Sequence, residues 1–206
     1  MGRIIVGYDG SEDAVAALEY AVAEALARQS SLALVYAVDD TVLNSVWGVV
    51  FDPDEIKSDA AAMMGEAVAQ AAKLGMPAEK VRAEVVLGDP AAALSKLSPR
   101  ADLVVLGRCS VGKGVSEFVG STAVGVAGAS ECPVVVVSAN NHRPEIPFGR
   151  VGVGVHIAAK GRVGLPVALA EARRRGAAVS VISVVKATQS RWRAASLTDE
   201  QQQQAM

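Results

Sequence analysis

Glycine and hydroxyl residues gather in one stretch of the chain, between Leu103 and Thr122. The stretch begins with an apolar run, residues 103–106, of the kind that a buried parallel strand shows. Four glycines follow, and then Ser121 and Thr122 stand where a helix is expected to begin and where a hydroxyl can cap it. Glycine lets backbone N–H groups approach a ligand closely, and a helix N-terminus adds partial positive charge. The pattern favours an anion-binding loop, with phosphate as the best candidate.

A Walker A loop is the main competing interpretation. Gly107, Gly112 and Lys113 match the first seven positions of its G-x-x-x-x-G-K pattern, but Gly114 stands where Ser or Thr should hold magnesium. The apolar helical pattern also begins only near Ser121, far beyond the lysine. Walker A is therefore disfavoured, while an ordinary glycine-rich loop without a ligand stays open.

Composition narrows the class of protein. The 206 residues are 51% hydrophobic and only 4% aromatic, which suits parallel strands covered by alanine-rich helices. The formal net charge of −2 gives no field that would attract nucleic acid. Two cysteines do not make a disulfide framework, and no apolar run reaches the length of a membrane span. We expect a soluble, cytoplasmic protein with no nucleic-acid or membrane partner.

Strands alternate with helices along the first two thirds of the chain. The pattern predicts strands at residues 3–8, 32–38, 81–87, 101–106 and 134–137, and helices at 12–28, 54–74, 91–97 and 121–129. Such alternation predicts an open, five-stranded parallel sheet with helices on both faces. If the strand order is 3-2-1-4-5, Asp9 and Gly107 lie together where the winding reverses, which is where such sheets bind ligands.

Four segments resemble the universal stress protein family, in its order and spacing. These are the first strand with its turn, the turn before the third helix, the fourth strand and the fifth strand, at residues 4–11, 88–90, 101–107 and 132–137. The glycine loop also resembles the family's nucleotide loop, G-x2-G-x9-G-[ST], through Gly107, Gly120 and Ser121. The resemblance covers residues 3–138 and implies a Rossmann-like fold of the adenine nucleotide alpha hydrolase type.

The resemblance implies a binding module for ATP, with or without Mg²⁺, in a stress-response protein that acts through its nucleotide-bound state. No catalytic residue is proposed. His142 and His156 lie far apart in the sequence and have no cysteines at ligand spacing, so no metal site is expected. The implied nucleotide-binding residues are Gly7, Tyr8, Asp9, Val38, Leu106, Gly107, Arg108, Ser110, Gly120, Ser121 and Thr122. Asp9 would lie beside the adenosine and Val38 beside the adenine.

Ser110 departs from the family pattern, which has glycine there. Its Cβ restricts the backbone, while its hydroxyl offers a group that can itself bind phosphate. Ser110 therefore keeps one alternative open, a family member that has lost nucleotide and serves as a structural or interaction protein. A second alternative is a slow ATPase that uses the same pocket. The ATPase needs a base and a magnesium ligand, and the carboxylates near the loop are Asp9 and Glu117.

The end of the chain begins a second module. After a linker at 140–149, residues 150–186 repeat the first strand, helix and second strand, and 187–206 form a polar tail that we expect to be disordered. The module at 1–139 thus precedes a truncated β-α-β copy, as in a tandem family member. In the family, modules usually pair through their fifth strands, so the resemblance implies a homodimer through Val134 to Val137.

Overall fold

The computed structural model describes residues 2–38, 53–108, 119–140, 149–155 and 164–183. The chain forms two compact units, Met1–Pro144 and Glu145–Met206.

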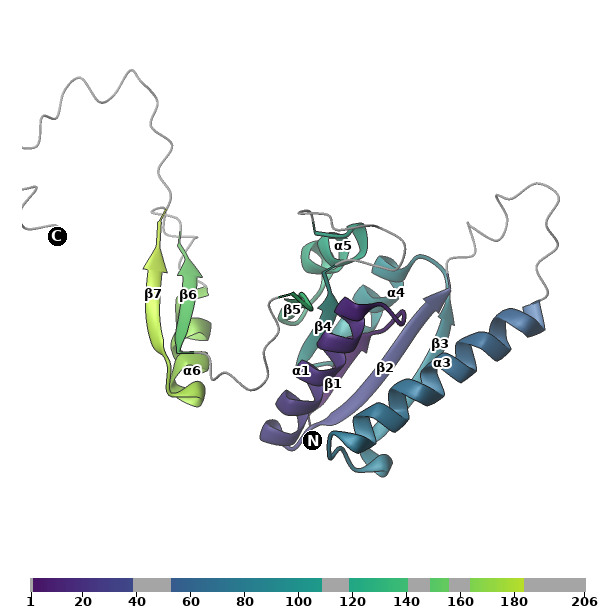
Figure 1. The fold of residues 1–206 in the computed structure, drawn as a ribbon. Helices are drawn as coiled ribbons and strands as arrows, with labels where there is room; N and C mark the ends of the chain where they lie inside the picture. The colour runs from purple at the N-terminus through teal and green to yellow at the C-terminus, as the bar shows by residue number, and fades with distance from the viewer. Residues whose placement is uncertain (1, 39–52, 109–118, 141–148, 156–163, 184–206) are drawn as a thin grey trace, which may run out of the picture. The chain divides into compact units, whose positions relative to one another are not determined.

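The first unit is built on a five-stranded parallel sheet (Figure 1). Its strands are β1 (Arg3–Gly7), β2 (Ser31–Val38), β3 (Val81–Leu87), β4 (Leu103–Gly107) and β5 (Val134–Val137). They lie in the order β3-β2-β1-β4-β5, which confirms the predicted topology. The register places Gly7, the last residue of β1, between Val35 of β2 and Leu106 of β4. The carboxyl ends of the three central strands therefore meet at one edge.

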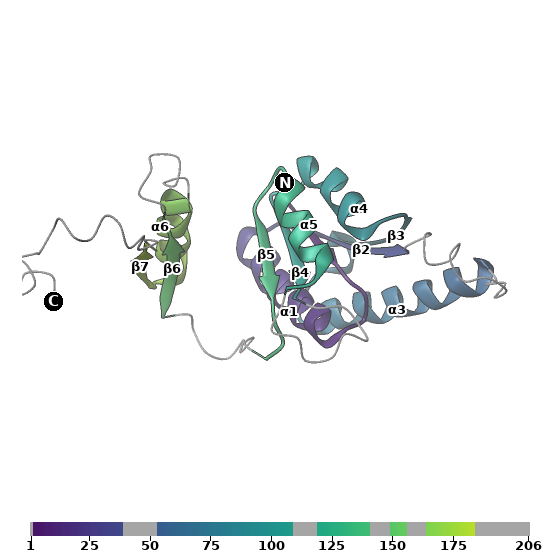
Figure 2. The ribbon, with the colours of Figure 1, turned by 90° about the horizontal axis from the view of Figure 1, so that it is seen from above.

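Helices cover both faces of this sheet, as predicted (Figure 2). The helices are α1 (Glu12–Arg28), α3 (Pro53–Lys73), α4 (Pro90–Leu97) and α5 (Ser121–Ala129), with short 3-10 turns at Ala78–Lys80 and Ser98–Arg100. Alternate strand residues point to the two faces, which divides the core in two. Ile4, Val6 and Leu34 pack with α1 and α3, whereas Ile5 and Val104 pack with α4 and α5.

Side-chain caps begin α1 and α4 but not α5. The Ser11 hydroxyl accepts a hydrogen bond from Ala14 N at 3.1 Å, and the Asp89 carboxylate accepts one from Ala92 N at 2.7 Å. Gly120 is the N-cap of α5, with no side chain to offer. The expectation that a hydroxyl caps α5 is wrong, because Ser121 and Thr122 are already its first helical residues.

The second unit contains β6 (Arg150–Gly154), α6 (Gly164–Arg175) and β7 (Ala178–Ile182). The two strands are parallel and pair with each other, which confirms the predicted partial β-α-β repeat. Val153, Ala168 and Ala172 are buried between strand and helix. Val181 and Ile182 remain 57% and 55% exposed, so this small unit leaves much of its apolar surface uncovered.

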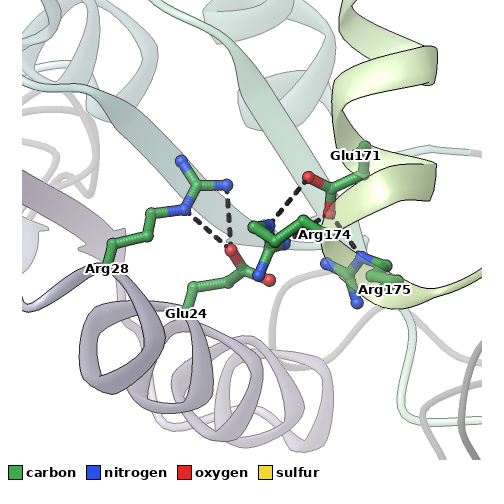
Figure 3. Close-up of polar contacts among 5 residues, drawn as sticks. All are labelled: Glu24, Arg28, Glu171, Arg174 and Arg175. Carbon is green, nitrogen blue, oxygen red and sulfur yellow. Dashed lines mark hydrogen bonds and ion pairs between the residues drawn. The ribbon is translucent and has the colours of Figure 1, made fainter.

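In each unit, ion pairs between side chains of the same helix stabilise one helix (Figure 3). In α1, Arg28 lies 2.9 Å from the Glu24 carboxylate. In α6, Glu171 accepts hydrogen bonds from Arg174, at 2.6 Å, and from Arg175. Burial raises the pKa of Glu171, but the hydrogen bonds and charges of the two arginines outweigh it and leave that pKa below its usual value. The basic run at the end of α6 thus stabilises its own helix, where cations complement the dipole.

Truncating the chain after Ala139 is expected to lower the melting temperature or change the oligomeric state. The reason is that Val181 and Ile182 are exposed within their own unit and are apolar enough to require burial against protein surface. In a protein of this length each lost kcal/mol lowers the melting temperature by about 2–4 °C. Differential scanning calorimetry measures the melting temperature, and light scattering measures the mass in solution. Unchanged melting and mass, with rapid proteolysis beyond Asn140 in the full chain, would show that the second unit contributes nothing.

Candidate functional site

A pocket opens at the carboxyl ends of β1, β2 and β4, within the first unit. It is an open pocket, and its empty space of about 490 Å³ includes open solvent. Six of the residues that line it were predicted from the sequence: Gly7, Tyr8, Asp9, Leu106, Gly107 and Thr122. The topology therefore brings the Asp9 turn, the end of β4 and the start of α5 to one place.

Four other predicted residues do not line this pocket. Val38 is buried at the end of β2, Arg108 and Ser121 lie next to lining residues along the chain, and Gly120 lies two residues before Thr122. Ser110 lies outside the residues that the structure describes. The roles assigned to these five residues stay predictions.

Asp9 has a structural role in addition to its place in the pocket. Its Oδ1 accepts hydrogen bonds from the Ser11 backbone N, at 3.1 Å, and from the Ser11 hydroxyl, at 2.7 Å. This turn fixes the residue that caps α1. Asp9 thus orients the start of α1 and at the same time presents a carboxylate to the pocket.

Two glycines allow the close packing that shapes the pocket. A Cβ on Gly107 would lie 2.8 Å from the carbonyl carbon of Asp13 and 2.9 Å from Ala14 N, both backbone atoms of α1. A Cβ on Gly7 would instead lie 2.5 Å from the end of the Leu106 side chain. Gly107 is therefore required by the approach of α1 to β4, whereas Gly7 makes room for side chains that line the pocket.

Backbone hydrogen bonds fix the start of α5. Gly120 N donates to Arg108 O at 2.7 Å, and Arg108 N donates to Val137 O at 2.8 Å. The Gly120 N–H is thus used within the protein rather than offered to a ligand. The N–H groups of Ser121 and Thr122 belong to the first turn of α5, where no acceptor exists within the helix. Together with the helix dipole, they favour an anion at this end of the pocket.

Tyr8 supplies a neutral polar group in the wall. Burial raises its pKa above the usual value, and the negative charges of Glu66 and Asp9 raise it further. The phenol therefore keeps its proton at physiological pH and can act as a hydrogen-bond donor.

The pocket also contains residues that sequence reasoning missed. They come from β2 and from α4: Val35, Tyr36, Ala37, Pro90 and Leu94, with Ala14 from α1. Their apolar character resembled that of ordinary core residues. The predicted strand order could have identified the residues from β2, since it places the end of β2 beside β1 at the point where the winding reverses.

An open parallel sheet with this order and a pocket at its winding reversal defines a Rossmann-like α/β protein. The model of the universal stress protein family matches residues 1–138. The chain belongs to the universal stress protein family.

Curated relatives and solved structures agree with this assignment. Universal stress protein Rv2028c of Mycobacterium tuberculosis is 34% identical over 191 residues, which cover 87% of this chain and 63% of the relative. The chain thus spans less than two thirds of that relative's length. The solved UspA of Lactobacillus plantarum is 29% identical, with a TM-score of 0.52 over 66% of this chain and 97% of its own. A universal stress protein of Archaeoglobus fulgidus has the same fold at 20% identity, with a TM-score of 0.66 over 93% of this chain and 68% of its own.

Two further observations concern the described part of the chain alone. None of its helices is both long and apolar enough to cross a membrane. Its His, Cys, Asp and Glu side chains form no group of three or more that could hold a metal ion.

Proposed function

We propose that the first unit binds an adenine nucleotide, ATP with or without Mg²⁺, and that the protein is a cytoplasmic stress-response regulator acting through its nucleotide-bound state. The observation that carries the proposal is the pocket in which Asp9, Gly107 and Thr122 meet. These residues come from three distant parts of the sequence, and their chemistry fits a nucleoside with attached phosphate.

The walls of the pocket suit the two ends of such a ligand. Val35, Tyr36 and Leu94 offer an apolar and aromatic side for the base. Thr122, in the first turn of α5, would hold phosphate through its hydroxyl and backbone N–H, and Asp9 would accept hydrogen bonds from the adenosine. Mg²⁺, if it accompanies ATP, would neutralise phosphate charge.

Solved relatives support an adenine nucleotide as the ligand class. A universal stress protein in complex with cAMP is 24% identical to this chain, with a TM-score of 0.52. The Archaeoglobus fulgidus protein in complex with dAMP is 19% identical, with a TM-score of 0.51. These ligands belong to those proteins, and for this chain they indicate which nucleotides to test beside ATP.

The homodimer through β5 is part of the same proposal. β5 lies at the edge of the sheet, next to β4 alone. An edge strand presents backbone N–H and C=O groups that a second copy can pair with, and Val136 is 38% exposed there. Sedimentation equilibrium of the full chain, with a proline replacing Val136, tests whether this edge forms the dimer.

Mass analysis of small molecules released by heat denaturation is the first test of nucleotide binding. The purified protein is expected to release an adenine nucleotide, and turnover assays then separate a binding protein from a slow ATPase. A protein that releases none and binds no added ATP, cAMP or dAMP would contradict the proposal and favour the nucleotide-free alternative.

Replacing Asp9 by alanine is expected to weaken ATP binding about tenfold or more, because a hydrogen bond to a charged acceptor is lost. Asp9→Asn keeps an oxygen that can accept the hydrogen bonds from Ser11, so it is the control for the turn. Gly120→Val should weaken binding too, since it changes the N-cap of α5. Calorimetric affinities unchanged in both Asp9→Ala and Gly120→Val, with the fold intact, would exclude the site.

A further inference from the structure

Asp13 is a buried acidic residue in the first turn of α1, and it joins three parts of the first unit. Its Oδ1 accepts a hydrogen bond from Ala139 N, just after β5, at 2.7 Å. Its Oδ2 lies 3.9 Å from Nε of Arg108, the residue that follows β4. One carboxylate therefore connects the start of α1 with the ends of two strands.

The ion pair lies next to the pocket wall. Arg108 follows Gly107 and Asp13 precedes Ala14, and both Gly107 and Ala14 line the pocket. The Gly107 Cα is packed so tightly against α1 that an added Cβ would lie 2.8 Å from the carbonyl carbon of Asp13. Neither charged side chain lines the pocket itself. An arginine and an acid thus form an ion pair just outside the residues that line the pocket.

We propose that Asp13 is a specificity-determining residue of the nucleotide pocket: its negative charge, 3.9 Å from Nε of Arg108, offsets the charge of that arginine and thereby limits how strongly the pocket attracts a polyphosphate. The inference rests on the proposed nucleotide function. A paired Asp and Arg exert little net field on a nearby phosphate, whereas an arginine without its acid would add one full positive charge. Asp13 therefore sets the preference between ligands that differ in charge, such as ATP and adenosine.

Substitution of Asp13 by asparagine removes the negative charge of this side chain and leaves its size nearly unchanged. Asn keeps a side-chain oxygen that can accept the hydrogen bond from Ala139 N, so the fold is expected to persist. Loss of this one negative charge beside the wall should tighten ATP binding about three- to tenfold, as expected for a single charge change in a partly aqueous environment. Adenosine carries no charge, so its affinity should stay within about twofold. The ratio of the two dissociation constants is therefore the diagnostic quantity.

Glu12→Gln is the matched control. It makes the same charge change one residue away, at an exposed position of the same helical turn. Isothermal titration calorimetry with ATP and with adenosine on the full chain compares the parent, Asp13→Asn, Glu12→Gln and Arg108→Gln, together with Asp13→Asn combined with Arg108→Gln. Arg108→Gln provides a measurement even if Asp13→Asn fails to fold, since it removes the positive charge of the pair and should weaken ATP binding relative to adenosine.

The preference for ATP is the dissociation constant of adenosine divided by that of ATP. We expect this ratio to rise in Asp13→Asn and to fall in Arg108→Gln. It should return near the parent value in the double variant and stay close to the parent value in Glu12→Gln. A parent that binds both ligands, with equal ratios in all variants, would overturn the role of Asp13 and leave the proposed function standing. A parent that binds neither ligand would refute the proposed function itself, and the inference with it.

Discussion

Gly107→Ala is expected to lower the free energy of unfolding by about 1–3 kcal/mol, the usual cost of forcing extra volume into a packed core. The added methyl group would lie 2.8–2.9 Å from backbone atoms of Asp13 and Ala14, which cannot rotate out of the way. To relieve the overlap, α1 must move away from β4. That movement would also displace Ala14 from the pocket wall and weaken nucleotide binding.

Gly7→Ala is the matched control for this substitution. Its methyl group meets the ends of Leu106 and Leu94, which are flexible side chains. Since both leucines line the pocket, this variant should change nucleotide affinity more than it changes stability. Urea denaturation followed by circular dichroism compares the two variants. Equal loss of stability in both would show that the backbone contact of Gly107 has no special cost.

Thr122→Glu is expected to weaken nucleotide binding strongly while leaving the fold intact. Thr122 is the second residue of α5 and lines the pocket, so a carboxylate there would oppose a phosphate directly. The same carboxylate is favourable for the helix, because acidic residues in a first turn complement the dipole by about 0.3–1 kcal/mol. Loss of binding therefore cannot be ascribed to unfolding. The affinity should fall at least about tenfold, for a like-charge contact near the protein surface.

Val124→Glu is the control for the added charge. Val124 lies on the same helix, is 59% exposed and does not line the pocket. Calorimetry with ATP should show near-parent affinity for Val124→Glu. If Thr122→Glu binds ATP as well as Val124→Glu does, the phosphate end of the proposed site does not lie at the start of α5.

The sheet could be predicted from the sequence because its strands are short apolar runs between turn residues. Val81–Leu87 and Val134–Val137 begin and end where the sequence pattern places them. The strand order was the condition under which Asp9 and Gly107 lie at neighbouring strand ends, and the structure has that order. Local patterns of this kind depend on few tertiary contacts, so they can be recognised in the sequence alone.

The pocket could be predicted only in part, because half of its wall depends on packing. Tyr36 and Leu94 become lining residues through the alignment of strand ends and the path of α4, which no local pattern reveals. Gly107 is the most informative case. Its place in a glycine-rich motif suggested close approach to a ligand, yet the structure shows that the backbone of α1 occupies the space a Cβ would need.

The hydrogen bond from Gly120 N to Arg108 O, at 2.7 Å, has a consequence for how this family can diversify. It joins the backbone just after β4 to the backbone just before α5, so these two elements are held together independently of the chain between them. Closing a longer segment between fixed ends costs only about 0.6 kcal/mol for each doubling of its length. β4 and α5 are therefore expected to keep their places when residue types between 108 and 120 change, and the fixed spacing of the family pattern is not required by the stability of the fold. Ligand preference can evolve there, or be grafted there, on an unchanged scaffold.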